Sequence, residues 1–293
     1  MNRAYFNGLK VVAKQKDEEL LLDLFPGAAA AFSLRKLRAA YTGAAIRVRR
    51  SSDDAEQDIG FDANNDLDTA ALLAFVGSGD GFAVTMYDQS LNGFHHTNDV
   101  PAEQIQVVEN GAVITTYLNV PNLRNNGGSA GFEREGSFLN NGEVSIFSIT
   151  AVPVYEGGKV PMIFDAAQGA NFGSNGSLRF DFFNADRLGT WNGSGNGDFI
   201  LSSRTPANTP VLRTGIATNS GLQSFVNGVL ADSDSKTGGV DFSRTTFTNF
   251  FGYKWVKDNV NTITGIMLVV YNNDQSANRE AIESNINNYY NVF

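Results

Sequence analysis

The sequence contains no cysteine and only two histidines. It therefore cannot form disulfides or thiolate metal sites, and it lacks the ligands that most zinc centres need. No apolar run approaches the roughly 18 residues of a membrane-spanning helix, and residues 1–20 lack the apolar segment of a signal peptide. Charged residues make up 18% of the chain, with a net charge of -9 and a pI near 4.7. We therefore expect no membrane insertion, no nucleic-acid partner and no cofactor.

Glycine and phenylalanine are abundant instead, with 30 and 22 residues. Glycine supplies the positive φ angles of tight turns, and phenylalanine favours half-buried strands. From Phe82 onward, apolar segments of strand length recur between turn-forming clusters. This pattern is typical of an all-β sandwich or jelly roll. Asn227-Gly228, between two apolar segments, predicts a type I′ hairpin, and we expect Asp232–Asp234 at a hairpin tip.

A few segments predict helices. The alanine-rich stretch Ala28–Tyr41 has helical spacing of its apolar residues. Asp68 is placed to cap a short helix over Thr69–Phe75. Near the end of the chain, Ile263–Tyr271 predicts a buried strand, and Ala277–Tyr290 predicts a helix that follows it.

Two segments carry a family resemblance: Ser33–Asp54 (SLRKLRAAYTGAAIRVRRSSDD) and Val84–Gly93 (VTMYDQSLNG). Together they resemble the start of the catalytic domain of the α-L-arabinofuranosidase B family. They resemble even more closely the version of that domain in bacteriophage and bacterial structural proteins. The resemblance implies a concanavalin A-like β-sandwich (jelly roll) with a few short helices, including an N-terminal and a C-terminal one. We assign this domain to residues 21–293, after an attachment arm at residues 1–20.

The resemblance to the glycosidase also implies two catalytic carboxyl groups. In that family the nucleophile is a Glu in a strand, flanked by Met and Ala and near a Cys-Cys pair, and the acid/base is an Asp in a late loop. This chain has no cysteine, and no Asp lies at the corresponding place, Phe251–Trp255. The mid-chain glutamates lie beside a Gly or two residues from one and are expected at the surface: Glu133, Glu135, Glu143 and Glu156. We therefore assign no catalytic residue from the sequence.

The sequence alone thus favours a non-enzymatic phage virion protein, such as a head decoration, tail or fibre component. It would be a homo-oligomer that binds other virion proteins through residues 1–20, with a host surface glycan as a further partner. The alternatives are an arabinofuranosidase-like glycoside hydrolase acting on cell-surface polysaccharide and a secreted bacterial carbohydrate-binding module, both extracellular. Three residues near Gly/Asn-rich loops are candidates for carbohydrate binding: Trp191, Trp255 and His95.

Several polar residues have structural interpretations. Asp62–Asp68 spaces oxygen ligands as calcium loops do, or it forms a turn followed by a helix cap, so no metal site is assigned. We expect Asp88 to accept hydrogen bonds from loop amides, after a strand in which Phe82, Val84 and Met86 alternate into the core. His95 and His96 are expected in a loop.

Overall fold

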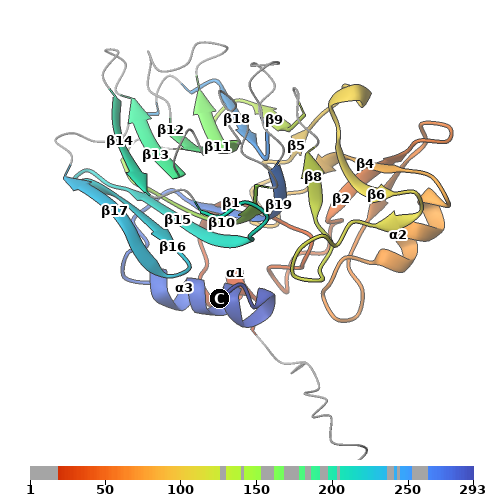
Figure 1. The fold of residues 1–293 in the computed structure, drawn as a ribbon, viewed down its shortest axis with the longest axis horizontal. Helices are drawn as coiled ribbons and strands as arrows, with labels where there is room; N and C mark the ends of the chain where they lie inside the picture. The colour runs from red at the N-terminus through yellow and green to blue at the C-terminus, as the bar shows by residue number, and fades with distance from the viewer. Residues whose placement is uncertain are drawn as a thin grey trace, which may run out of the picture.

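The computed structural model describes residues 19–125, 130–139, 142–152, 162–167, 178–181, 186–191, 197–202, 205–235, 241–242, 245–252 and 263–293. The predicted arm lies almost entirely outside these residues and stays a prediction, as does the homo-oligomer. The described part is mostly antiparallel β-structure (Figure 1). None of its helices has the length and apolar character that crossing a bilayer requires.

One layer of strands is built around β19, in the order β17–β16–β15–β10–β19, and β19 also pairs with β1 and β8. Each of these pairings is antiparallel. The bounds are β1 Ala28–Ser33, β8 Leu123–Asn125, β10 Val144–Ala151, β15 Val211–Ala217, β16 Gly221–Val226, β17 Val229–Ser235 and β19 Ile263–Tyr271.

A second layer follows the order β14–β13–β12–β11–β18–β9–β5–β4, with β2 and β6 beside β4. It meets the first layer where β6 pairs with β8. The bounds are β2 Ile46–Arg50, β3 Glu56–Ile59, β4 Gly81–Met86, β5 His96–Thr97, β6 Ile105–Glu109, β7 Ala112–Val113, β9 Phe132–Glu135, β11 Met162–Ala167, β12 Leu178–Asp181, β13 Asp186–Trp191, β14 Gly197–Ser202 and β18 Phe247–Phe250.

The main core lies between the two layers, where side chains such as Phe32 and Leu268 of the first layer share a cluster with Phe164 and Phe250 of the second. A second cluster covers the outer face of the first layer, against which α1 (Leu21–Leu24) and α3 (Arg279–Tyr290) pack. Figure 1 shows α3 beneath β15 and β10. The remaining helical elements are α2 (Thr69–Val76) and the short 3-10 helix η1 (Pro101–Glu103). This arrangement is consistent with a β-sandwich.

The predicted helix over Ala28–Tyr41 is wrong. Ala28–Ser33 forms the strand β1, which pairs with β19 and is buried along its whole length. Alanine has high helix propensity, but tertiary contacts override propensity when a small side chain fits between packed layers. Here Ala30 contributes to the core between the layers, and Ala31 contributes to the cluster beneath the first layer.

Three local predictions are confirmed. Asp68 caps α2 by accepting a hydrogen bond from the Ala71 amide at 2.9 Å. Asn227 and Gly228 both have positive φ, 51° and 78°, as a type I′ turn requires. Ile263–Tyr271 forms the buried strand β19, and α3 follows it.

Two further details differ from expectation. Asp232–Asp234 lies inside β17, not at a hairpin tip. In β4, the alternation of Phe82, Val84 and Met86 into the core is broken. The core residues are Ala83 and Met86, because the pairing with β2 shifts register within β4. A bulge of this kind changes which residues face inward.

Candidate active site

Four polar residues form a row across neighbouring strands of the second layer. Arg179 of β12 lies opposite Asp165 of β11, which lies opposite Asn249 of β18, and Asn249 lies opposite Glu133 of β9. Residues directly opposite one another in a ladder share a face of the sheet. The adjacent row, which consists of Phe180, Phe164, Phe250 and Phe132, is in the core. The polar row therefore occupies the face turned away from the core.

The alternation of the strands produces this placement. In β11, Phe164 and Ala166 are core residues, so Asp165 between them projects to the other face. In β18, Asn249 stands between Thr248 and Phe250. Asp165 is 0% exposed and Asn249 is 1% exposed. A buried polar pair on an outer sheet face requires a compensating interaction, because burial removes its water.

The two carboxyl oxygens of Asp165 differ in their contacts. Its Oδ1 lies 3.5 Å from Arg179 Nε, whereas Oδ2 has no hydrogen-bond partner among the described residues. Burial raises the pKa of the Asp165 carboxyl to about 6, although Arg179 lowers it in part. The result is a buried carboxyl group that holds a proton in mildly acidic solution and has one oxygen without a partner among the described residues.

Two arginines hold a second carboxylate nearby. Asp181 Oδ1 accepts a hydrogen bond from Arg187 Nε at 2.9 Å, and Asp181 Oδ2 lies 3.7 Å from Arg179 Nε. Arg179 thus lies between Asp165 and Asp181. These ion pairs fix the guanidinium that in turn orients Asp165.

The other side of Asp165 offers recognition groups. Asn249 has neither Nδ2 nor Oδ1 hydrogen-bonded within the described part of the chain. Beyond it, Glu133 is partly buried and lies two strands from Asp165, about 10 Å between Cα atoms at ordinary strand spacing. Two carboxyl groups that share one face of the sheet can flank a sugar ring, as the paired carboxyl groups of glycosidases do.

The described structure does not test whether the three predicted carbohydrate-binding residues lie together. His95 is exposed, and its Nδ1 accepts a hydrogen bond from the Asp88 amide at 3.0 Å, with its ring edge-on to Tyr87. Trp191 ends strand β13 opposite Gly197, and Trp255 lies outside the described residues. The carbohydrate-binding roles of all three stay predictions.

His96 and Glu133 differ from the sequence-based expectation. His96 is 0% exposed in β5, where its Nε2 lies 2.8 Å from Thr248 Oγ1. Burial among Phe32 and Phe250 lowers its pKa to about 3. Glu133, which was expected to be an ordinary surface residue, is partly buried and lies in the polar row. Asp165 and Asn249 were not singled out, although a lone Asp inside the apolar strand of Phe164 and Ala166 was the available signal.

The loop after β4 is structural, as expected. Asp88 accepts hydrogen bonds from the amides of Ala31, Ser90 and Phe94 at 2.9, 2.9 and 3.0 Å. At Asp62–Asp68, the carboxylate of Asp62 accepts from the amides of Asn64 and Asp66, which forms a turn before α2. The described residues contain no group of three or more His, Cys, Asp or Glu side chains placed to hold a metal ion.

The family model of the α-L-arabinofuranosidase B catalytic domain matches residues 24–200. The chain belongs to this family. Its polar row takes Glu133, Asp165 and Arg179 from inside the matched segment and Asn249 from outside it. No curated protein matches the chain by sequence.

Solved arabinofuranosidases share the fold. One, a GH54 α-L-arabinofuranosidase soaked with a cyclic sulfate inhibitor, is 15% identical with a TM-score of 0.65. Another, an arabinofuranosidase complexed with arabinofuranosyl-α-1,2-xylobiose, is 15% identical with a TM-score of 0.64. Each comparison covers 91% of this chain and 64% of the other chain, so the chain spans somewhat less than two thirds of these enzymes.

These findings correct the interpretation of the chain as a non-enzymatic virion protein. The chain belongs to the arabinofuranosidase B catalytic-domain family and shares its fold with solved arabinofuranosidases, and nothing in these matches indicates a phage. The local sequence around each carboxyl group does not match the context of the family's catalytic pair. Carboxyl groups that are separate in sequence can still meet on one sheet face.

Proposed function

We propose that this domain is an arabinofuranosidase-like glycoside hydrolase that releases arabinofuranosyl units from polysaccharide, on a concanavalin A-like jelly roll. Asp165 carries the proposal, because it combines a buried carboxyl oxygen that has no partner among the described residues with a pKa raised to about 6. Those are the properties of a general acid that protonates a departing glycosidic oxygen. The family membership supports the substrate class.

The remaining members of the row take complementary roles in this proposal. Glu133, on the same face as Asp165, is the second carboxylate, which attacks the anomeric carbon or activates a water. Asn249 stands between them and offers both a donor and an acceptor to sugar hydroxyls. Arg179 is a positioning residue that orients Asp165 through the contact between Arg179 Nε and Asp165 Oδ1.

The test is hydrolysis of an aryl α-L-arabinofuranoside by the purified chain and its variants. Asp165→Asn and Glu133→Gln keep the side-chain volume. The first removes the proposed general acid, and the second removes the proposed second carboxylate. Each should lower kcat/KM by about 10²- to 10⁴-fold. The matched control is Glu135→Gln, an exposed residue two positions along the same strand, which should keep the full rate.

Two results would overturn the proposal. If the wild-type chain binds arabinofuranosides but does not hydrolyse them, the domain is a binding domain and not a hydrolase. Turnover that survives Asp165→Asn at the wild-type rate would remove the general acid from the polar row. Melting temperatures of all variants, measured alongside, separate lost chemistry from lost folding.

A further inference from the structure

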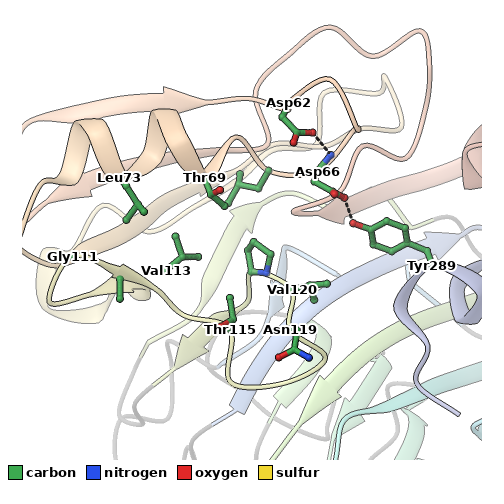
Figure 2. A pocket seen from close by; sticks show the side chains of 13 residues that line it. Asp62, Asp66, Thr69, Leu73, Gly111, Val113, Thr115, Asn119, Val120 and Tyr289 are labelled. Atoms are coloured by element: carbon green, nitrogen blue, oxygen red, sulfur yellow. Dashed lines mark hydrogen bonds between the residues drawn. The ribbon is translucent and has the colours of Figure 1, made fainter. Parts of the chain in front are cut away.

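A groove lies away from the polar row, between the α2 region, the segment after β7 and the end of α3. Its volume is about 590 Å³, a size typical of small-molecule sites. In Figure 2, Thr69 and Leu73 lie on one side, Val113, Thr115 and Asn119 on the other, and Tyr289 at the end. None of the strands that carry the polar row contributes a lining residue.

The charges in the groove restrict what it can bind. Among the described residues that line it, the charged side chains are Asp62 and Asp66. An anion would meet these carboxylates, and the neighbouring cation, the Arg35 guanidinium, is stacked on the Tyr289 ring, so phosphorylated and acidic ligands are disfavoured. The lining therefore selects a neutral or cationic ligand.

The hydrogen bonds of the two carboxylates argue against a cation. Asp62 accepts from the Asn64 amide at 2.8 Å, from Asn64 Nδ2 at 3.2 Å and from the Asp66 amide at 3.0 Å. Asp66 accepts from the Tyr289 hydroxyl (Figure 2). Donors already aimed at a carboxylate occupy part of its acceptor capacity and fix its orientation. The groove thus presents oriented acceptors and not a pair of unsatisfied negative charges.

The rest of the lining combines hydroxyl and amide groups with aliphatic surface. Thr69, Thr115 and Asn119 supply donors and acceptors, and Leu73 and Val113 supply apolar contact. A sugar ring matches this combination, because it has hydroxyls at its edge and C–H groups on its face. Stacking on Tyr289 is not the mode of binding, since the Arg35 guanidinium already lies over that ring at 3.6 Å.

The backbone at the rim holds Asn119 in a rarely populated conformation. Leu118 and Asn119 have φ of 60° and 53°, a left-handed region that non-glycine residues seldom adopt in succession. Such a backbone conformation is sparsely populated and clusters at ligand-binding sites. It places the Asn119 amide at the groove.

We propose that this groove is an accessory binding site for a neutral saccharide, separate from the polar row of β12, β11, β18 and β9. The recognising groups are the carboxylates of Asp62 and Asp66, the hydroxyls of Thr69 and Thr115, and the Asn119 amide. The ligand class follows from the lining and does not depend on hydrolysis at Asp165.

The test is calorimetric titration of the full chain with arabinotriose and, separately, with xylotriose. Thr115→Arg places a long side chain at an exposed lining position, and Asn119→Gly removes the amide where glycine tolerates the positive φ. Each should weaken saccharide binding at least five-fold. Thr116→Arg, an exposed neighbour that does not line this groove, is the control and should bind as wild type.

Asp165→Asn separates this site from the polar row. Binding that survives Asp165→Asn and is weakened by Thr115→Arg supports the accessory site. Binding that is lost in Asp165→Asn and unchanged in Thr115→Arg assigns the saccharide to the polar row and overturns the proposal. Absence of binding by the wild-type chain to either trisaccharide overturns it as well. Thermal unfolding of each variant confirms that the fold is intact.

Discussion

Replacing Asp88 by alanine should strongly destabilise the fold without touching the proposed active site. The Asp88 side chain is 1% exposed and joins β1 to the loop after β4. Its removal leaves the amides of Ala31 and Ser90 without their acceptor, both in buried residues. A buried donor left unsatisfied costs about 1 to 3 kcal/mol. Two such donors give a loss of about 4 kcal/mol in the free energy of unfolding.

For a domain of this size, a loss of about 4 kcal/mol lowers the melting temperature by roughly 7 °C or more. Thermal unfolding followed by circular dichroism measures this shift. Asp99→Ala, an exposed aspartate nearby, is the matched control and should melt within about 1 °C of wild type. An Asp88→Ala chain that melts as wild type but no longer binds saccharide would refute the reasoning, because Asp88 would then be a ligand residue.

Three other predictions follow from buried groups and tight backbone. Because general-acid catalysis needs a protonated Asp165, with its pKa raised to about 6, kcat/KM should fall as the pH rises through about 6. If Asp165→Asn retains activity and shows the same fall, the assignment of Asp165 as the general acid is contradicted. His96, with its pKa lowered to about 3, stays neutral in the fold while the unfolded chain protonates below pH 6.5. The contribution of His96 to the free energy of unfolding should therefore be fully present above pH 6.5 and about 2 kcal/mol smaller at pH 5. Urea unfolding compares the pH dependence of the free energy of unfolding in Asp165→Asn with that in Asp165→Asn that also carries His96→Gln. An equal pH dependence in the two chains would count against the assignment. Gly252→Ala should lower the melting temperature more than Gly142→Ala, because both have positive φ but only the Gly252 position would place Cβ 1.7 Å from the Ala130 carbonyl oxygen.

Local signals in the sequence determined the local elements. The cap at Asp68, the turn at Asn227-Gly228 and the strand Ile263–Tyr271 each depend on residues that are neighbours in the chain. Their backbone geometry follows from side-chain chemistry within a few residues, so pattern reading is sufficient. The abundance of Phe and Gly likewise indicated an all-β class before any topology was known.

The composition of the polar row and the departures from local propensity depend on the tertiary structure. Glu133, Asp165 and Asn249 lie far apart in sequence and meet because antiparallel register places them opposite one another. Strands that are distant in sequence pair in the register that buries their apolar faces, so the partners of each residue depend on how the layers pack. For the same reason Ala28–Ser33 became a strand, since pairing with β19 outweighed alanine's helical preference. The sequence by itself determined which elements could form, and the packing of the layers determined which residues they brought together.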